Sequence, residues 1–293
     1  MEFFSVLKRG FDEYPNLMSM ILRCPVCYEP LHKEGKTYVC PHRHSYDISK
    51  SGYVNLMLAN QGRHLEEGDT KESLTNRQFF LEKGYYSFLR EHLVQLLTSL
   101  NLGNHFEFAD LGCGEGYYTS YLASSFPNAH FLGVDISKNA INMLSKRAKA
   151  IPNLEGVVGN LDYLPIQDET IDVALNCFAP ICEKEFRRIL KASGYYIRVL
   201  PSENHLIELK QALYEVPRSN TPKELEMEGF EIIKKEEISK KVQMPQEDFI
   251  SLFLMTPYAF KSDEDSLSKL KAIPELEMTI GFDIRLYRLK TQK

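Results

Sequence analysis

The chain has 293 residues, of which 43% are hydrophobic and 26% are charged, and its formal net charge is -5. This composition predicts one large or two modest folded domains, while the negative charge weighs mildly against nucleic-acid binding, which usually needs a basic surface. No apolar run approaches the roughly 20 residues that span a bilayer, and the first residues lack the order of a secretory signal, so we expect a cytoplasmic protein.

Four segments differ in their sequence pattern. Residues 1–22 form a leader with helical spacing and no recognisable chemistry, and residues 23–58 hold a cluster of cysteines and histidines. Residues 59–83 contain glycines and charges that interrupt any periodic pattern, so we expect a linker there. Residues 84–293 alternate between strand and helix patterns, which predicts an α/β domain with a parallel sheet.

Three of the six cysteines, Cys24, Cys27 and Cys40, lie close together near the N-terminus. This clustering favours a metal site over a disulfide framework, and zinc takes four soft or borderline ligands in a tetrahedron. His42 and His44 are both candidates for the fourth ligand, and we favour His44 because its spacing from Cys40 lets the chain turn back more easily. A site with four protein ligands has no open position, so the zinc should be structural. Reduced thiols without a metal are the alternative.

The expected elements of the α/β domain follow in regular order, with helices where apolar residues recur at helical spacing and strands where short apolar runs end in turns. The expected strands are 106–111, 130–134, 154–158, 171–178, 195–200, 230–233 and 278–289. The expected helices are 86–100, 117–126, 137–148, 183–190, 205–214 and 246–256. Ser137 is expected to cap the third helix. The last two strands can form an antiparallel hairpin at one edge of the sheet.

A glycine-rich loop, Asp110-Leu-Gly112-Cys-Gly114-Glu-Gly116, follows the first strand and opens a helix. Glycines in such a loop let the backbone approach a cofactor closely, and Asp135 at the end of the next strand can accept hydrogen bonds from both ribose hydroxyls. The spacing G-x-G-x-G differs from that of dinucleotide enzymes, and Asp110 would repel a pyrophosphate but suit a cationic amino-acid tail. We therefore predict S-adenosylmethionine as the cofactor, with a nicotinamide or flavin cofactor as the alternative.

Further positions carry weaker signals. Asn176 ends the fourth expected strand, where it either holds the edge of a base or closes a strand-terminal turn. Cys177 and Cys182 could suggest thiol catalysis, but no partner motif supports it, and we expect buried core cysteines. His205 follows the fifth strand at the ligand-binding edge of the sheet, where it is either a surface residue or a functional one.

In combination, the motifs resemble those of the bacterial large-subunit (23S) rRNA guanine-N1 methyltransferases, over nearly the whole chain from Cys24 onward. The shared motifs are Cys-Pro-x-Cys at 24–27, Cys-Pro-x-Arg-His at 40–44, Lys-x-Gly-Tyr-Val-Asn-Leu at 50–56, Asp-x-Gly-Cys-Gly-Glu-Gly-Tyr-Tyr-Thr at 110–119 and Phe-Ala-Pro at 178–180. The resemblance implies a class I Rossmann-like S-adenosylmethionine-dependent methyltransferase with a small N-terminal zinc-binding domain. The leader before Cys24 has no counterpart in the family, and Asn176 stands where one branch has a basic residue.

The resemblance also assigns roles to single residues. The implied zinc ligands are Cys24, Cys27, Cys40 and His44. The implied contacts to S-adenosylmethionine are Tyr86, Tyr118, Thr119 and His205. Members of the family methylate a guanine in a hairpin of domain II of 23S rRNA and form dimers, so the implied partners are that hairpin and a second copy of the chain.

The expected reaction moves a methyl group from a sulfonium to guanine N1, so the protein mainly orients the two partners and excludes water. Because N1 lies on the Watson–Crick edge, the target guanine must be unpaired or flipped out. Basic residues of the zinc module and its C-terminal flank are expected to grip the phosphates of the hairpin: Lys33, Lys36, Arg43, Lys50 and Arg63. A small-molecule methyltransferase and a non-enzymatic zinc-ribbon RNA-binding protein are the alternatives. A small-molecule methyltransferase has no evident use for the zinc module. A non-enzymatic RNA-binding protein has no use for an intact cofactor loop.

Overall fold

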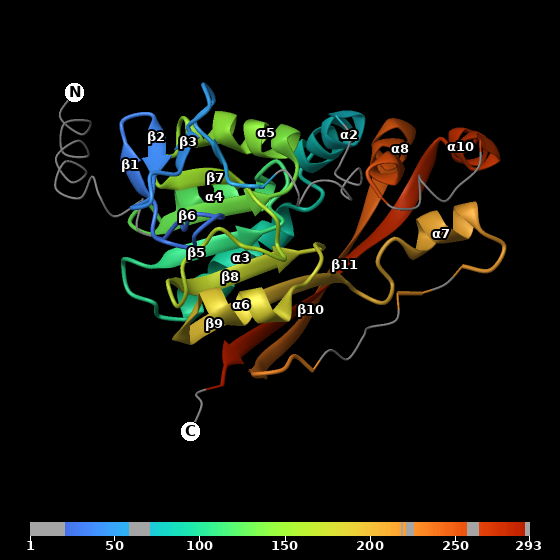
Figure 1. The fold of residues 1–293 in the computed structure, drawn as a ribbon. Helices are drawn as coiled ribbons and strands as arrows, with labels where there is room; N and C mark the ends of the chain where they lie inside the picture. Colours follow the sequence, from blue (N-terminus) through green and yellow to red (C-terminus); the bar gives the residue numbers. More distant parts are fainter. Residues whose placement is uncertain (1–20, 59–70, 218, 221–225, 257–263, 291–293) are drawn as a thin grey trace, which may run out of the picture.

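The computed structural model describes residues 21–58, 71–217, 219–220, 226–256 and 264–290 (Figure 1). Its centre is an eight-stranded sheet. In spatial order the strands are β10 (Phe230–Pro245), β11 (Glu275–Leu289), β9 (Leu190–Pro201), β8 (Ile171–Cys177), β5 (Glu107–Leu111), β6 (His130–Asp135), β7 (Leu154–Val158) and β4 (Val54–Asn55). β11 runs antiparallel to both of its neighbours, and the pairs from β9 to β4 are parallel. The order and directions place the carboxyl ends of β5, β6 and β8 at one edge of the sheet.

Both faces of the sheet are covered, because successive side chains of each strand point to opposite faces and both sets are apolar. We call the face that carries Phe108, Phe131 and Val173 the helical face. The helices that pack on it are α3 (Ser87–Ser99), α4 (Tyr117–Ser125), α5 (Lys138–Ala148), α7 (Ile207–Leu213) and α8 (Gln246–Leu254). The opposite face, with Leu132 and Ala174, is called the module face. It is covered by α6 (Glu183–Ile189) and by the zinc module, residues 22–53, which contains β1 (His32–Glu34), β2 (Thr37–Val39) and β3 (Ser45–Asp47).

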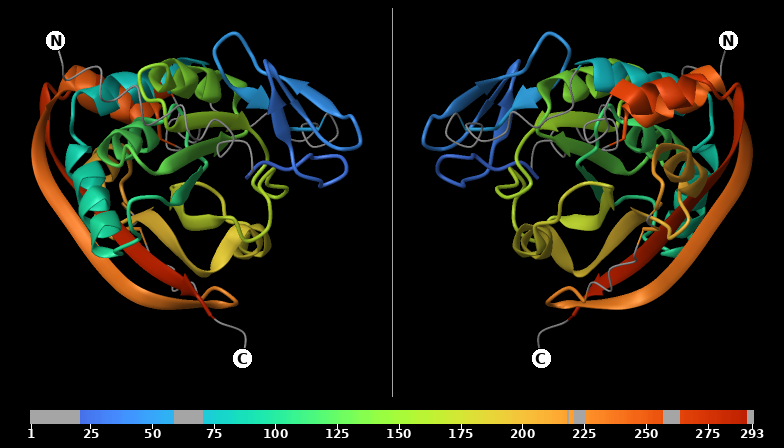
Figure 2. Two further views of the ribbon diagram at one scale, coloured as in Figure 1. Left: turned by 90° about the vertical axis from the view of Figure 1, so that its left-hand side faces the viewer. Right: turned by 90° about the vertical axis from the view of Figure 1, so that its right-hand side faces the viewer.

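Most predicted elements of the α/β domain are confirmed within a few residues. The Ser137 side chain accepts a hydrogen bond from the backbone N–H of Ala140, at 3.3 Å, and so caps α5 as predicted. The edge hairpin is also confirmed, although β10 extends to Pro245, well beyond the predicted range 230–233, while β11 begins three residues before the predicted range 278–289. Figure 2 shows the two strands as two long curved ribbons, orange and red, along the side of the molecule.

One part of the sequence prediction is wrong. Residues 71–82, where a linker was expected, form helix α2 (Lys71–Glu82), which packs on α8 and buries Phe80 and Leu81. Its stability comes from this tertiary contact rather than from a periodic apolar stripe, so no clear pattern shows in the sequence. Residues 54–55, near the end of the predicted zinc-binding segment 23–58, form β4 and extend the main sheet beside β7. Of the predicted leader, residues 1–20 lie outside the described residues.

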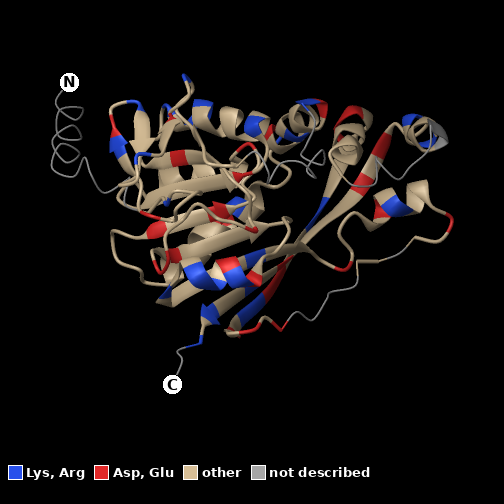
Figure 3. Cartoon of the chain, in the orientation of Figure 1, with Lys and Arg blue, Asp and Glu red and all other residues tan. Residues whose placement is uncertain are grey.

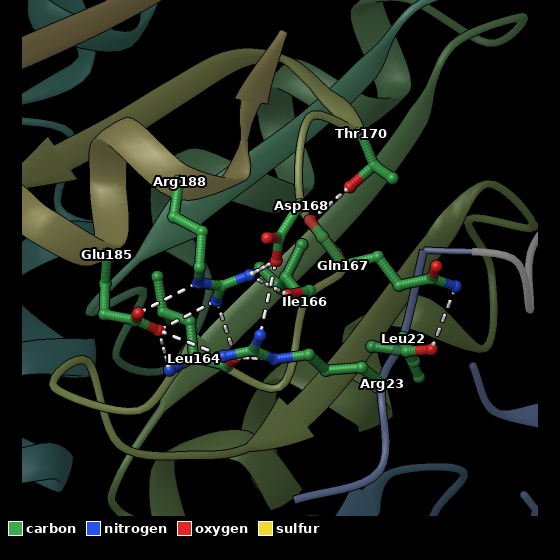
Figure 4. A network of polar contacts seen from close by, with 9 residues as sticks. All are labelled: Leu22, Arg23, Leu164, Ile166, Gln167, Asp168, Thr170, Glu185 and Arg188. Atoms are coloured by element: carbon green, nitrogen blue, oxygen red, sulfur yellow. Dashed lines mark hydrogen bonds and ion pairs between the residues drawn. The ribbon is translucent and has the colours of Figure 1, made fainter. Parts of the chain in front are cut away.

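A polar network fixes the start of the zinc module to the module face (Figure 4). Nε of Arg23 donates to the carbonyl of Leu164 at 3.2 Å, and the same guanidinium lies 3.3 Å from Asp168 and 3.6 Å from Glu185. Arg188 of α6 contacts the same two carboxylates at 2.6 and 2.8 Å. Arg23 directly precedes Cys24, so this network holds the beginning of the cysteine cluster against the sheet.

A second, more buried network ties the middle of the module to the amino-terminal ends of the strands. Tyr38 of β2 is 1% exposed, and its hydroxyl donates to Glu155. His130 lies beside Glu155 and contacts Glu107 at 2.6 Å. Burial alone would lower the pKa of His130, but the two carboxylates raise it above its ordinary value, so the ring favours its charged form. The described residues include no helix long and apolar enough to cross a membrane.

Candidate active site and zinc site

The structure brings Cys24, Cys27, Cys40 and His44 together, with their ligand atoms all within 4.8 Å of one another. Cys27 Sγ lies 3.6 Å from Cys40 Sγ, and Nδ1 of His44 lies 3.5 Å from Cys24 Sγ and 3.3 Å from Cys40 Sγ. A zinc tetrahedron with Zn–S bonds of about 2.3 Å has sulfur–sulfur edges of about 3.8 Å, so the cluster fits this ion. His42 is exposed and is not part of the group.

Tyr46 of β3 supports the cluster from outside. Its hydroxyl lies 3.1 Å from Cys24 Sγ, where it can donate a hydrogen bond to the thiolate. Such an outer hydrogen bond orients a metal ligand, and sequence reasoning did not single this residue out. With four protein ligands and no open position, the site is built to stabilise the module and not to activate a substrate.

The glycine loop leaves β5 in a tight turn at the carboxyl edge of the sheet. Gly112 has a φ of +86°, and a Cβ there would lie 2.3 Å from the Cβ of Ala179. The backbone N–H groups of Gly112 and Cys113 both donate to the carbonyl of Val134, at 2.8 and 3.1 Å. A side chain at Gly112 would therefore push the segment after β8 away from the loop, which explains why glycine is needed there.

Asp110 lies buried beneath this loop. It is 1% exposed, and its Oδ2 accepts a 2.6 Å hydrogen bond from the hydroxyl of Thr119, which is itself fully buried. Burial raises the pKa of Asp110 to about 7, against the opposing effect of the Thr119 donor. Its second oxygen, Oδ1, is buried and has no hydrogen-bond partner among the described residues. A buried acceptor of this kind suits a cationic group such as an ammonium.

Asp135, at the end of β6, braces the loop. Its Oδ2 accepts from the N–H of Gly114 at 2.9 Å, and its Oδ1 accepts from the N–H of Ser137 at 2.8 Å. Each carboxylate oxygen can accept a second hydrogen bond, so the predicted contact with ribose hydroxyls is compatible with this arrangement.

His205, which lies between β9 and α7, contacts Tyr86, the residue before α3. Nδ1 of His205 accepts from the N–H of Gly281 at 3.2 Å, so in the neutral ring the proton sits on Nε2, which faces the Tyr86 hydroxyl at 3.3 Å. Burial lowers the pKa of His205 to about 4, so the ring is neutral at physiological pH.

Phe178 is the residue that sequence reasoning left without a role of its own. It follows β8 with a φ of +60°, a conformation that a bulky side chain rarely adopts. The turn places its ring 5.8 Å from that of Phe282, which also packs on Tyr86 and His205. Phe178 is nevertheless 45% exposed, so this aromatic cluster presents one open face to solvent. Backbone strain next to a cofactor loop often marks a functional position.

The remaining predicted residues are placed as follows. Asn176 is 1% exposed, and its Nδ2 donates to the carbonyls of Leu111 and Pro180 at 3.1 and 3.0 Å, so the side chain ties the loop after β8 to β5. Burial raises the pKa of Cys177 well above its ordinary value, which keeps the thiol protonated and argues against a nucleophile. Tyr118 of α4 is buried in the helical-face core next to the loop.

These features define the class of the protein: a class I S-adenosylmethionine-dependent methyltransferase with an N-terminal zinc ribbon. Residues 22–64 match the family "RlmA, N-terminal", a zinc ribbon, and residues 108–200 match the family "Methyltransferase domain". S-adenosylmethionine and zinc are accordingly its two cofactors.

Three curated relatives match almost the whole chain. One is the "Putative 23S rRNA (guanine-N(1)-)-methyltransferase" of Micromonospora griseorubida, with 30% identity over 94% of this chain and 99% of the relative. Another is the "23S rRNA (guanine(748)-N(1))-methyltransferase" of Streptomyces fradiae, with 30% identity over 90% of this chain and 95% of the relative. The protein YxjB of Bacillus subtilis (strain 168), which has a name of the same type, is 29% identical over the same shares. The chain belongs to the family of 23S rRNA guanine-N1 methyltransferases.

Proposed function

We propose that the chain methylates N1 of a guanine in a hairpin of domain II of 23S rRNA, with S-adenosylmethionine as the methyl donor. The observation that carries the proposal is the separation of two sites on one sheet. The zinc module contacts the amino-terminal ends of the strands through Tyr38 and Glu155, whereas the glycine loop lies at their carboxyl ends. β8 has seven residues and spans roughly 20 Å, so a substrate that touches both sites must be macromolecular.

The relatives and the surface of the module support RNA as that substrate. The names of the relatives specify guanine N1 of 23S rRNA. Four of the five basic residues predicted to grip phosphates are exposed, namely Lys33, Lys36, Arg43 and Lys50, and Arg63 lies outside the described residues. Long cationic side chains at a surface bind phosphates without reading sequence, which fits a module that positions a folded hairpin.

When bound, S-adenosylmethionine supplies an electrophilic methyl group on a sulfonium. In our proposal, Asp110 accepts hydrogen bonds from the ammonium of the amino-acid tail, and Asp135 accepts hydrogen bonds from the ribose hydroxyls. In the same proposal the cofactor is also contacted by the four residues that the resemblance implies, namely Tyr86, Tyr118, Thr119 and His205. The neutral state of His205 avoids repulsion with the sulfonium.

The guanine must leave its stack to be methylated at N1, and the open face of Phe178 is where we propose that it rests. Every base has a π face, and stacking on an aromatic side chain contributes roughly 1–3 kcal/mol. Asn176 then acts by holding the loop that carries Phe178, and its role in positioning the base is indirect. Transfer would break the S–C bond, form the N1–C bond and leave S-adenosylhomocysteine, with the N1 proton passing to water.

The experiment that tests this proposal maps reverse-transcription stops on 23S rRNA incubated with the protein and S-adenosylmethionine, because N1-methylguanine blocks base pairing. We expect a new stop in the domain II hairpin, and no stop with the Asp110→Asn variant as control. Absence of any stop near the hairpin would rule out the rRNA target. A stop at a neighbouring guanine would change the position of the target and leave the reaction unchanged.

We also propose that the chain acts as a homodimer in the cytoplasm, with residues 23–58 recognising RNA and residues 84–293 transferring the methyl group. A dimer would combine two modest basic surfaces, which offsets the net charge of -5. Sedimentation equilibrium should then give twice the chain mass of 33.8 kDa, and a single-chain mass would contradict the dimer.

A further inference from the structure

Four polar side chains lie in one row across the C-terminal half of the sheet. Asn176 of β8 pairs with Arg198 of β9, Arg198 pairs with Arg285 of β11, and Arg285 pairs with Lys235 of β10. Directly paired residues point to the same face of a sheet. The next row toward the amino end of β9 contains Tyr196, which belongs to the core of the module face, so the row lies on that face too.

Arg198 differs from Arg285 because no carboxylate of the described residues forms an ion pair with its buried guanidinium. The residue is 8% exposed, and both Nε and Nη1 are buried without a hydrogen-bond partner among the described residues. Arg285 is equally buried, but its guanidinium is held by Asp283 at 2.7 and 3.0 Å. Lys235 is exposed to water. The uncompensated charge of the row therefore resides on Arg198.

A second donor lies next to this guanidinium. The hydroxyl of Tyr196, two residues earlier on the same strand and face, is also buried and has no hydrogen-bond partner among the described residues. Its phenol lies close enough to Arg198 to be influenced by that charge, although burial dominates and raises the pKa of Tyr196. A guanidinium and a hydroxyl, two kinds of donor, thus lie on one strand and one face, and the buried atoms Nε and Nη1 of Arg198 and the hydroxyl of Tyr196 have no hydrogen-bond partner among the described residues; Oδ1 of the paired Asn176 is likewise buried without one.

Burying an unpaired cation costs far more than burying a neutral group, and a protein keeps such a residue where an anion completes it. A guanidinium binds a phosphate through two parallel N–H···O bonds, which a lysine cannot do. We propose that Arg198, with the Tyr196 hydroxyl, forms a phosphate site that holds a backbone phosphate of the RNA substrate. The identification of the ligand as RNA rests on the proposed function. The presence of an anion site does not, because it is argued from the buried donors alone.

The position of Arg198 favours RNA as the source of the phosphate. It is paired with Asn176, two residues before Phe178, and it lies on the face to which the zinc module is docked. Figure 3 shows further basic residues on α6 and on the lower parts of β10 and β11. A strand of RNA that runs from the zinc module to Phe178 would pass Arg198. A contact between Arg198 and a backbone phosphate would then determine which guanine lies opposite Phe178.

The first experiment measures the thermal unfolding midpoint of the full chain in increasing inorganic phosphate. The variants are Arg198→Met and, as a matched control, Arg288→Met, which removes an exposed arginine of β11 that stacks on Tyr195. Phosphate should raise the midpoint of the wild type and the control but not of Arg198→Met. Without phosphate, Arg198→Met should be at least as stable as the wild type, because an unpaired buried charge is gone. A less stable Arg198→Met with no phosphate effect in the wild type would overturn the site and make Arg198 a structural residue.

The second experiment identifies the source of the phosphate. Binding of a fluorescent domain II hairpin is followed by anisotropy over a range of salt concentrations. Arg198→Met should weaken binding roughly tenfold or more and reduce the slope of log K against log salt by about 0.7–0.9, the value for one phosphate contact. A phosphate effect on unfolding together with an unchanged slope would exclude RNA and leave a site for a free anion. If the wild type neither binds nor methylates the hairpin, the proposed function fails, while the unfolding data still decide on the anion site.

Discussion

Replacement of Asp110 by asparagine tests whether the buried carboxylate receives the cationic tail of the cofactor. In the free protein the pKa of Asp110 is about 7, because burial disfavours the charged form. If the ammonium of the cofactor binds the carboxylate, binding must release a proton below pH 7. The ionised fraction of Asp110 falls from about one half at pH 7 to about one hundredth at pH 5, so affinity should fall roughly 50-fold over this range.

The assay is isothermal titration calorimetry with S-adenosylhomocysteine, which keeps the amino-acid tail and is chemically inert. The Asp110→Asn variant should bind more weakly at pH 7, and its affinity should be nearly constant from pH 5 to pH 7. The His205→Gln variant is the control: since the pKa of His205 is about 4, its titration lies below this window and the pH dependence should persist. A flat wild-type profile, or a slope that survives in Asp110→Asn, would refute the reasoning.

The same shift predicts how Asp110 affects folding. Its pKa is raised from 3.8 in the unfolded chain to about 7 in the folded chain, so the folded state binds the extra proton between these values. The contribution of protonated Asp110 to the free energy of unfolding is therefore fully present below about pH 4, and it is lost as the pH rises to about 7. Bound cofactor should cancel this loss by pairing with the carboxylate.

Three further predictions concern single side chains. Cys24→Ser should abolish bound zinc, measured by plasma mass spectrometry, and lower the unfolding midpoint, whereas Cys182→Ser should keep the metal; equal zinc content in both would contradict the assigned ligands. Tyr38→Phe should cost about 1–3 kcal/mol in urea unfolding, because it leaves the largely buried carboxylate of Glu155 without its donor, and an unchanged midpoint would show that this contact does not hold the module. Phe178→Ala should lower kcat/KM for the RNA roughly 5- to 100-fold while leaving cofactor affinity unchanged; a loss of cofactor affinity instead would place Phe178 in the cofactor pocket.

The zinc cluster and the cofactor loop could be predicted from the sequence because their chemistry is local. Cys24 and Cys27 sit on one turn, and Cys40 and His44 on another, so spacing alone indicates which side chains can converge. The cofactor loop likewise needs residues without a Cβ at Gly112 and Gly116, where an added Cβ would lie less than 3 Å from a neighbouring side chain. The alternation of strands and helices was equally visible, because each buried strand is a short apolar run.

Features that depend on contacts distant in the sequence were not predictable in this way. Helix α2 is held by packing on α8, which follows it by more than 160 residues, so its own pattern is weak. The exposed ring of Phe178 results from a backbone conformation that no spacing rule reveals. The burial of Arg198 beside Arg285 follows from the register of β9 on β11, and a one-residue shift of β9 would turn Arg198 to the other face and separate the two side chains.

The most direct test of the account is nucleoside mass spectrometry of a domain II hairpin RNA after incubation with the zinc-loaded protein and S-adenosylmethionine. The account predicts one N1-methylguanosine per hairpin, and its loss when the chain carries Cys24→Ser and the module can no longer hold its metal. Methylation at another atom of the base, or methylation that is undiminished without the zinc module, would contradict the claim that the two sites act together on one RNA.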